Sequence, residues 1–426
     1  MPNMKLPSGA SVAIIGAGII GVSSAYALVR RGYEVTVYDP EPPGEAGSSR
    51  ANAGHIAASD IYPLSSPGIH WKALKILMNQ DGALKIPLGD AVAQLPWFWR
   101  FWRTSQPKQF EAATNALSYL CSRALTDTKA MFDAAGMADM LTQNGCAFLY
   151  DTEKSLNASK SGWAGKHAAG FTSESIDANK IAQDIPDIAN QFRYGVLSHQ
   201  WAKVREPLDS VRGLAKAAES KGVRFVKARV DSFSSTTSPN KDVVKLEINN
   251  GLYQHDAVIV AAGIGSTVFA KSCGDFLPMA VERGYNLTAP TPDIELDLSL
   301  VFADRGVVAT QLTSGLRIGG WAEYANSNRP PNKKYFNSIA RISKDLFPKL
   351  NLGNASYWMG SRPSLPDSVP VISRSSNTNR VFYVCGHGHY GLTHAATSAN
   401  ILTDLIDGVS EVQKYSAYSI TRFSSK

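Results

Sequence analysis

This sequence has few cysteines and no long run of like charge. It also has no segment typical of a secretion signal. The four cysteines, Cys121, Cys146, Cys273 and Cys385, lie far apart and form no CxxC pair. We therefore expect neither a disulfide framework nor a zinc or other metal site. Because no secretion signal is recognisable, the cytoplasm is the expected location.

The basic residues outnumber the acidic ones but do not cluster. The net charge is +7, yet the lysines and arginines occur at most as doublets such as Arg30 and Arg31. We expect no nucleic acid partner, because binding a phosphate backbone requires a concentrated basic patch. A small anionic substrate fits the charge balance at least as well.

The start of the chain has the pattern of a Rossmann unit. Val12–Ile15 is typical of a buried strand, Ile19–Arg31 of a helix and Glu34–Tyr38 of a second strand. Between the first two elements, Gly16–Gly21 matches GxGxxG, and Asp39 follows about twenty residues later. The glycines let the backbone approach a pyrophosphate at the helix N-terminus, and the acid can bind a ribose hydroxyl. This combination predicts binding of a dinucleotide, either FAD or NAD.

Further elements of the same kind recur later in the chain. The patterns predict a long amphipathic helix from 107 to about 136, a helix over 208–218 followed by a strand over 223–230, and a hairpin turning at 249–251. A buried strand over 381–385 and a helix over 392–407 follow near the end. The β-rich segments around Tyr285, Val307 and 317–323 predict an antiparallel sheet in another domain.

Five motifs, in family order, resemble the D-amino acid oxidase-like family of FAD-dependent enzymes. They are Ser49–Gly54, Val260–Gly263, Arg283–Tyr285, Arg362–Pro370 and Gly386–Gly391. Members of that family include D-amino acid dehydrogenases, sarcosine oxidases and glycine oxidases. The resemblance covers nearly the whole chain and selects FAD, expected to be bound noncovalently, over NAD.

Within the family, the chain is most similar to the glyphosate oxidoreductase and iminodiacetate oxidase-like branch, next to the small subunit of D-amino acid dehydrogenase. Pro42–Glu45, Trp358–Gly360, Arg362–Ser368 and Gly386–His389 carry this likeness. The pattern of the D-amino acid dehydrogenases has glycine where this chain has Ser368. This departure weakens a D-amino acid substrate without excluding it.

The resemblance and the chemistry of the residues together indicate a flavin site. Asn52–Gly54 forms a small-residue turn where backbone amides could approach the isoalloxazine ring, or a plain tight turn. Gly386–Gly391 leads into a helix whose dipole could stabilise negative charge on a reduced flavin, or is a flexible loop. The residues expected to contact the cofactor are Gly16, Gly18, Ile19, Ile20, Gly21, Asp39, Pro40, Ser49, Asn52, Ala53, Gly54, Val230, Ala262, Gly263, Arg362, Gly386, Gly388, His389, Tyr390, Gly391, Leu392 and Thr393.

Arginine is the residue type suited to hold a substrate carboxylate. In the resembled family, the arginine that matches Arg362 grips the carboxylate with a bidentate fork. Arg283 and Tyr285 are a second anion contact or a buried structural pair. Arg317 is a weaker candidate, since an arginine on a strand more often points to solvent.

Histidines are the natural candidates for accepting the proton of an amine near neutral pH. His55, His387, His389 and His394 lie in or near the predicted flavin motifs, and His55 and His387 rank first by position. Each could equally serve only as a hydrogen-bonding group, because hydride transfer needs no strong base once the amine is neutral.

The segment Pro96–Arg103, with the sequence PWFWRFWR, combines aromatic residues with arginine. This composition is typical of an interfacial membrane segment and also of buried packing between domains. We favour packing. If the segment is exposed, the enzyme would sit on the inner face of the membrane and pass electrons to quinone.

These observations predict an α/β (α+β) protein with a Rossmann-like FAD-binding domain and a discontinuous substrate domain that contains a mixed or antiparallel sheet. The FAD domain is expected to comprise residues 1–60, 206–278 and 355–426, and the substrate domain residues 61–205 and 279–354.

The expected reaction is oxidation of a C–N bond by hydride transfer to flavin N5, followed by hydrolysis of the imine. An iminodiacetate-like or glyphosate-like secondary amine would yield glyoxylate and a primary amine. The alternatives are a D-amino acid dehydrogenase acting on D-alanine or D-proline-like substrates, an NAD-dependent dehydrogenase, and a flavoprotein that modifies tRNA. The electron acceptor is left open between oxygen, a quinone and a carrier protein.

Overall fold

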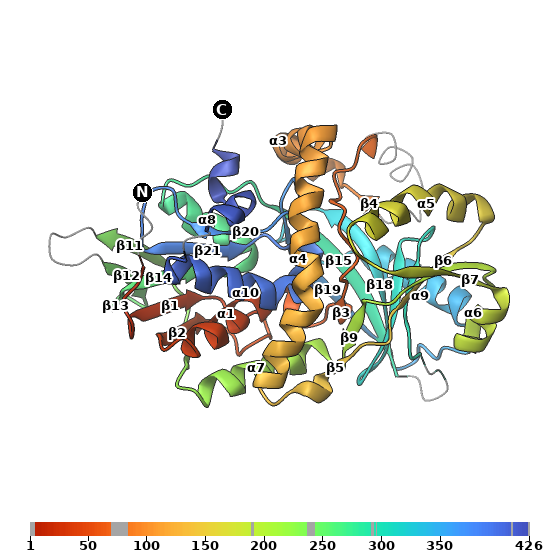
Figure 1. Ribbon diagram of the computed structural model, residues 1–426, viewed down its shortest axis with the longest axis horizontal. Coiled ribbons are helices and arrows are strands. Elements are labelled where there is room, and N and C mark those ends of the chain that lie inside the picture. Colours follow the sequence, from red (N-terminus) through yellow and green to blue (C-terminus); the bar gives the residue numbers. More distant parts are fainter. Residues whose placement is uncertain are drawn as a thin grey trace.

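The computed structural model describes residues 5–69, 84–188, 191–236, 243–290, 294, 296–409 and 412–424. Two large sheets form the two halves of the molecule, and the long helix α4 (Pro107–Ala134) runs between them (Figure 1). None of the helices in these residues is long and apolar enough to cross a membrane.

The first half is built on a six-stranded sheet in the order β10-β2-β1-β14-β21-β20. Its neighbouring strands pair in parallel except for β20, which pairs antiparallel with β21. The strands are β1 (Ser11–Ile15), β2 (Glu34–Asp39), β10 (Arg224–Lys227), β14 (Ala257–Val260), β20 (Val371–Arg374) and β21 (Val381–Cys385). The central strands β1, β14 and β21 are buried on both faces and almost entirely apolar, while the edge strand β10 is largely exposed.

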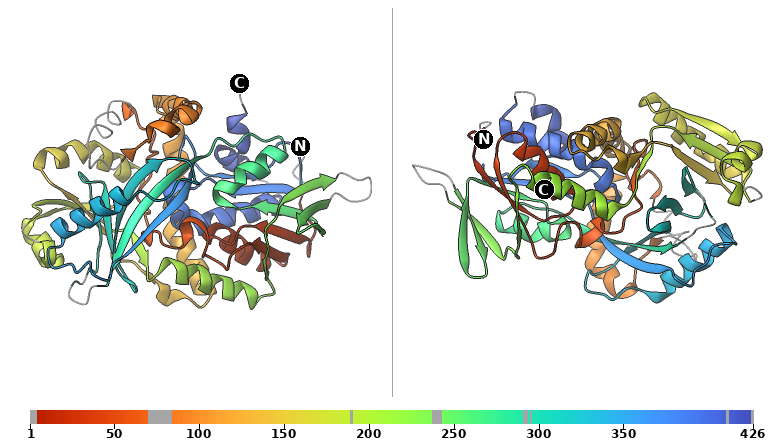
Figure 2. Two further views of the ribbon diagram at one scale, coloured as in Figure 1. Left: turned by 180° about the vertical axis from the view of Figure 1, so that it is seen from behind. Right: turned by 90° about the horizontal axis from the view of Figure 1, so that it is seen from below.

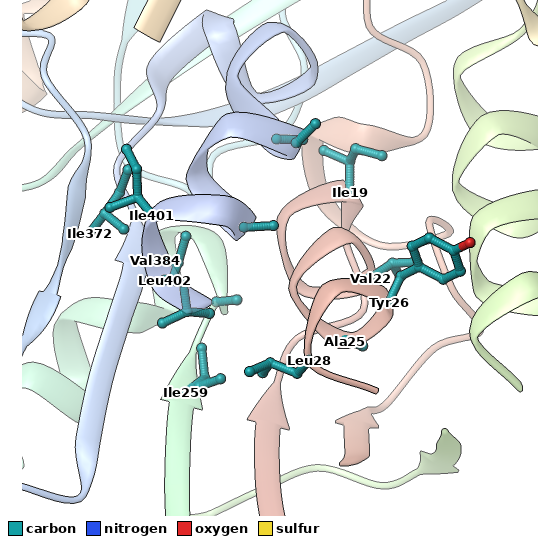
Figure 3. Packing of buried hydrophobic residues seen from close by; sticks show 14 of the residues in the cluster. Ile19, Val22, Ala25, Tyr26, Leu28, Ile259, Ile372, Val384, Ile401 and Leu402 are labelled. Atoms are coloured by element: carbon teal, nitrogen blue, oxygen red, sulfur yellow. The ribbon is translucent and has the colours of Figure 1, made fainter. Parts of the chain in front are cut away.

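Helices and a small sheet complete this half. The helices are α1 (Ile19–Val29), α7 (Pro207–Glu219), α8 (Ser266–Ser272) and α10 (Gly391–Asp407), and the small sheet consists of β11 (Ser232–Thr236), β12 (Val243–Ile248) and β13 (Gly251–His255). Helices α1 and α10 pack together over the sheet, and Figure 3 shows buried side chains of this core, among them Ile19, Leu402 and Ile259.

The second half is built on a nine-stranded sheet with the path β19-β15-β18-β17-β16-β6-β8-β7, while β4 pairs with β18. The strands are β4 (Leu84–Lys85), β6 (Cys146–Tyr150), β7 (Ser173–Asp177), β8 (Tyr194–Ser198), β15 (Ala280–Ala289), β16 (Ser299–Phe302), β17 (Val307–Leu312), β18 (Gly315–Tyr324) and β19 (Ser356–Ser364). The helices α5 (Glu153–Ala168), α6 (Ala178–Asp184) and α9 (Lys333–Leu346) belong to this half (Figure 2).

Short elements connect the two halves. A three-stranded sheet contains β3 (His55–Ile56), β5 (Leu141–Thr142) and β9 (Ala202–Val204), and helix α3 (Leu88–Thr104) precedes α4. The 3-10 helices are η1 (Gly47–Ser49), η2 (Ala138–Met140), η3 (Pro186–Ile188), η4 (Gly263–Gly265), η5 (Gly388–Tyr390), η6 (Val412–Tyr418) and η7 (Ile420–Phe423).

The predicted fold class is confirmed, since a Rossmann-like sheet adjoins a separate mixed sheet. The hairpin turns through Asn249 and Asn250, both with positive φ, and helix α10 ends at Gly408 with φ +65°. The strand expected over 223–230 is shorter, because β10 ends at Lys227.

The predicted domain ranges stay a prediction, and the structure departs from them in two places. Strand β19, which was assigned to the FAD domain, pairs with β15 in the nine-stranded sheet. Helix α4, which was assigned to the substrate domain, packs against α10 and contributes Leu117 and Leu120 to the core of the first half. Apolar periodicity predicts that a helix face is buried, but it does not say against which sheet.

Candidate active site

A cavity of about 840 Å³ is lined by residues of both large sheets. Its walls come from the first β–α turn, the segments 46–57 and 228–231, the turn after β14, strands β15, β18 and β19, and the loop after β21. Segments from residue 15 to residue 393 therefore build one site.

The N-terminus of α1 opens onto one end of this cavity. Gly16 has φ +109°, and a Cβ there would stand 2.5 Å from the carbonyl oxygen of Ala261, while a Cβ on Gly21 would stand 1.9 Å from the oxygen of Gly16. These glycines allow the turn and the helix to pack against the strands. The Asp39 carboxylate accepts a hydrogen bond from the Ala17 amide at 2.8 Å, which fixes it at the end of β2.

Ser49 and residues 51–53 line the cavity, and this segment is held from the second sheet. Arg317 Nη1 donates to the carbonyl of Asn52 at 2.8 Å, and Asn286 Nδ2 donates to the carbonyl of Ala51 at 2.7 Å. The Asn52 side chain accepts from the Gly54 amide at 2.8 Å. The turn is therefore positioned by β15 and β18, and not by local hydrogen bonds alone.

The loop after β21 closes the cavity beside α10. Gly386 has φ +78°, and a Cβ there would stand 2.2 Å from Cδ1 of Leu365. Gly388 also has positive φ, at +53°. On the first turn of α10, the Thr393 hydroxyl accepts a hydrogen bond from the Ala57 amide at 3.0 Å. This loop therefore has a fixed conformation, in agreement with the turn into a helix that the sequence indicates.

The far end of the cavity carries an arginine and a carboxylate in contact. Arg362 Nη1 donates to Oε1 of Glu282 at 2.7 Å and to the carbonyl of Trp321 at 3.3 Å. Ser364 Oγ donates to the other oxygen of Glu282 at 2.7 Å. Burial alone would raise the pKa of Glu282, but Arg362, His389 and the Ser364 hydrogen bond hold it below its usual value. An ionised acid and an arginine therefore lie together at this end.

Arg283 points away from the cavity. Side chains alternate along β15, so Glu282, Gly284 and Asn286 line the cavity while Arg283 is fully buried on the opposite face. Its Nη1 lies 3.1 Å from Oε2 of Glu323. This placement corresponds to the buried structural pair, and it corrects the expectation that Arg283 contacts the substrate.

Tyr285 borders the cavity, but its side chain lies on the same face of β15 as that of Arg283, since both contact Oε2 of Glu323. Its hydroxyl donates to Glu323 Oε2 at 2.6 Å and accepts from the Asn332 amide at 3.2 Å. The hydroxyl is thus engaged away from the Arg362 end.

His55 and His387 both line the cavity, and both are held neutral. Desolvation lowers the pKa of His55 to about 4 and that of His387 to about 3. His55 Nε2 is hydrogen-bonded to the Thr310 hydroxyl, and His387 Nε2 lies 2.9 Å from Ser398 Oγ. Imidazoles with such low pKa values bind a proton weakly, which favours hydrogen bonding over a role as general base.

Arg317 is buried, and the expectation that it points to solvent is wrong. Its Nη2 lies 3.1 Å from Oε1 of Glu206, and its Nε donates to the Thr288 hydroxyl at 2.9 Å. With its charge paired in this way and its Nη1 on the Asn52 carbonyl, Arg317 has a positioning role at the cavity wall.

The expected cofactor residues line the cavity with two exceptions, Gly21 and Gly54. Gly21 packs against the Gly16 turn, and a Cβ on Gly54 would stand 2.9 Å from Cδ2 of Leu312. Both glycines therefore pack behind the residues that line the cavity. Of the expected catalytic residues, Arg362, His55, His387 and Tyr285 line the cavity.

Sequence reasoning missed several residues at this site. Glu282 and Gly284 flank the noted Arg283, so their alternation on a strand was the available signal. Trp321 also lines the cavity and adopts φ +60°, a strained conformation for a bulky residue that turns its carbonyl toward Arg362. Nothing in the sequence signals this conformation.

Comparison with known proteins identifies the cofactor that this cavity holds. A family model described as FAD-dependent oxidoreductase matches residues 11–405. The chain belongs to this family of FAD-dependent oxidoreductases. The site agrees with the assignment, because the glycine-framed N-terminus of α1 and Asp39 suit a dinucleotide and the long cavity leads from there to Arg362. The NAD-dependent alternative is thereby corrected.

Two curated relatives match over most of their length. A D-amino-acid oxidase of Bradyrhizobium diazoefficiens is 30% identical over 98% of this chain and 100% of its own. A D-amino acid dehydrogenase of Cereibacter sphaeroides is 33% identical over 93% of this chain and 92% of its own.

Solved structures share the fold at lower identity. Glycine oxidase from Geobacillus kaustophilus has a TM-score of 0.74 at 18% identity, covering 97% of this chain and 99% of its own. Iminodiacetate oxidase from a Chelativorans species has a TM-score of 0.70 at 16% identity, covering 93% and 95%. At these identities, the likeness shows the fold alone.

Proposed function

We propose that this flavoenzyme oxidises the Cα–N bond of a small D-amino acid that carries a single carboxylate. The observation that carries the proposal is the pair formed by Arg362 and Glu282 at the end of the FAD cavity. The relatives described as D-amino-acid oxidase and D-amino acid dehydrogenase support the same substrate class.

The charges at this end suit a zwitterion. Arg362 has five N–H donors, and within the part of the chain that the structure describes its hydrogen bonds to Glu282 and Trp321 use Nη1. The remaining donors can bind one substrate carboxylate, and the ionised Glu282 can attract the substrate ammonium. Arg317, the next arginine along the wall, is paired with Glu206. A second carboxylate would lack a cation among these residues, because Arg362 is itself paired with Glu282 and Arg317 with Glu206.

The chain's own groups bind and orient the substrate. The substrate ammonium would first lose one proton to water, bound FAD would accept the hydride from the substrate carbon, and water would then hydrolyse the imine. Arg362 and Glu282 would hold the carboxylate and the nitrogen on either side of the reacting carbon, which fixes the carbon relative to the cavity wall. His55 and His387, being neutral, would line the site without adding charge.

Ser368 does not argue against a D-amino acid. Its φ is +60°, in the left-handed region that favours glycine. Its hydroxyl accepts a hydrogen bond from the Leu64 amide at 3.0 Å, and the residue does not line the cavity. The difference from the dehydrogenase pattern therefore concerns a turn.

An N-carboxymethyl amine such as iminodiacetate or glyphosate is the second candidate. The motifs at 42–45, 358–360, 362–368 and 386–389, which resemble the glyphosate oxidoreductase branch, favour it. A tRNA substrate is not favoured, since the cavity lining carries both signs of charge and includes Asp60 and Glu282 as well as Arg362.

An anaerobic flavin-bleaching panel tests the proposal. D-alanine and D-proline are expected to reduce the flavin at lower concentration than iminodiacetate, glyphosate, sarcosine, glycine or L-alanine. Reduction by iminodiacetate at the lowest concentration would replace the proposed substrate with the second candidate. Mixing the reduced enzyme with oxygen, a soluble quinone or a carrier protein then identifies the electron acceptor.

A further inference from the structure

Helix α3 divides the aromatic segment Pro96–Arg103 between two faces. Trp97 is buried and packs against Tyr324, with ring centroids 5.0 Å apart, and Phe98 lies 5.6 Å from the same ring. One face of α3 is therefore packed against the protein, as the sequence analysis favoured. The opposite face has a different character.

The other side of α3 exposes a stripe of large apolar side chains. Val92, Leu95, Trp99 and Trp102, here called the α3 outer face, are 47% to 74% exposed. Their spacing of three, four and three residues places them along one side of the helix. Figure 1 shows α3 at an edge of the molecule, beside one end of α4. Two exposed tryptophans one turn apart are costly in water and indicate a partner.

The charges around the α3 outer face are positive. The guanidinium of Arg103 lies 4.9 Å from the centre of the Trp99 ring, and that of Arg100 lies 4.8 Å from the ring of Phe276, which is itself 44% exposed. The single acidic residue of α3 is Asp90, whose carboxylate is paired with Arg329 at 3.1 Å.

We propose that the α3 outer face docks on the surface of an anionic phospholipid bilayer. Tryptophan and arginine side by side match the boundary between acyl chains and phosphate headgroups, where rings enter the apolar layer and guanidinium groups bind phosphate. The helix lies parallel to the surface, with Trp99 and Trp102 inserted and Arg100 and Arg103 at headgroup level. The net charge of +7 supports the same orientation toward an anionic surface.

The inner face of α3 connects this surface to the active site. Tyr324, on which Trp97 and Phe98 pack, adjoins Ser364 and Glu282 at the substrate end of the cavity. A docked enzyme would therefore hold the substrate end of its FAD cavity close to the bilayer.

Vesicle flotation of the FAD-loaded enzyme tests the proposal. Vesicles of phosphatidylcholine with one third phosphatidylglycerol should carry the enzyme upward, and phosphatidylcholine vesicles should carry it much less. The double variant Trp99→Ser/Trp102→Ser should lower the partition coefficient at least tenfold, roughly the value of burying such side chains. Arg103→Ala should lower the partition coefficient about fivefold. Added salt should cause a similar decrease for the parent enzyme.

Matched controls separate docking from general stickiness. Leu252→Ser/Tyr253→Ser removes two exposed apolar side chains from β13, at the far end of the molecule, and should leave the partition unchanged. The flavin spectrum and the D-amino acid activity of every variant in solution should match the parent, since none of these residues lines the cavity.

Three outcomes would overturn the proposal: no binding to anionic vesicles, binding that the tryptophan variant retains, or a dimer in light scattering that only this variant dissociates. The last outcome would assign the α3 outer face to a second copy of the chain. Because the assay detects binding and not turnover, its result is independent of the substrate proposal.

Discussion

The guanidinium of Arg362 lies against the backbone of Gly284, so closely that a Cβ on residue 284 would stand 2.2 Å from Nη2 and 2.3 Å from Cζ. Substitution Gly284→Ala should therefore displace the arginine. We expect the KM for D-alanine to rise about tenfold or more, since misplaced binding groups commonly cost such factors, with FAD content unchanged. Gly162→Ala on α5, where a Cβ would meet no atom within 4 Å, is the control. An unchanged KM would refute this positioning role.

Substitution Arg362→Lys should weaken binding of the substrate carboxylate. Lysine keeps the charge but loses the planar fork, and hydrogen bonds to charged groups are worth about 1.5 to 3 kcal/mol each. We expect the dissociation constant of D-alanine, measured by flavin bleaching, to rise by roughly one to two orders of magnitude. Arg341→Lys, on the exposed side of α9, should change nothing. Identical kinetics for Arg362→Lys and the parent enzyme would remove Arg362 from its assigned role.

Substitution Glu282→Gln should change which substrates are accepted. The amide keeps the size of the side chain but removes the negative charge that faces the substrate nitrogen. Binding of zwitterionic D-alanine should weaken about tenfold, in the range of a lost charged hydrogen bond, while binding of iminodiacetate, which has two carboxylates and a net negative charge, should improve. The ratio of the two kcat/KM values is the measurement. Parallel changes for both substrates would show that the carboxylate does not select charge.

Stability should fall as the pH drops below neutrality. Desolvation lowers the pKa of His387 from 6.5 to about 3, so between these values the unfolded chain binds a proton at this residue that the folded protein does not. The contribution of neutral His387 to the free energy of unfolding is therefore complete above pH 6.5. It decreases as the pH falls from 6.5 toward 3. The free energy of unfolding, measured in urea, should fall less between pH 7 and pH 5 for His387→Gln than for the parent protein. A parent curve that is flat over this interval would contradict the prediction.

Removing the cofactor should destabilise the protein without breaking a covalent bond. Precipitation with acid should leave the yellow FAD in the supernatant, because noncovalent attachment is expected. The apoprotein should melt at a lower temperature than the holoprotein, and added FAD should restore the melting point, since a ligand that binds only the folded state stabilises it. Flavin retained in the precipitate would indicate a covalent link.

The sequence predicted the dinucleotide end of the site more completely than the substrate end. Gly16, Gly18 and Asp39 belong to one β–α–β unit, where spacing along the chain fixes position in space. Glu282 and Arg362 meet because β15 and β19 pair with residue 282 opposite residue 362, and the sequence does not encode that register in any local pattern.

The same limit explains the errors on β15 and β18. The motif around Arg283 indicates a strand with polar residues, but these occupy alternating faces, and the motif alone does not say which face lines the cavity. An arginine on a strand more often points to solvent, and nothing local to Arg317 signals its partner, Glu206, which lies 111 positions away in the chain. Helix α3 illustrates the converse, since its composition indicated both packing and exposure, and the fold assigns one to each face.

Asn286 and Arg317 hold residues 51 and 52 by hydrogen bonds, which determines when the cavity can form during biosynthesis. A ribosome that has released only the first β–α–β unit has made the glycine turn, but not the side chains that hold the next segment over the cavity. The wall that includes Thr393 emerges later still. The complete cavity therefore forms only once nearly the whole polypeptide is available, and tight binding of FAD is expected late in folding.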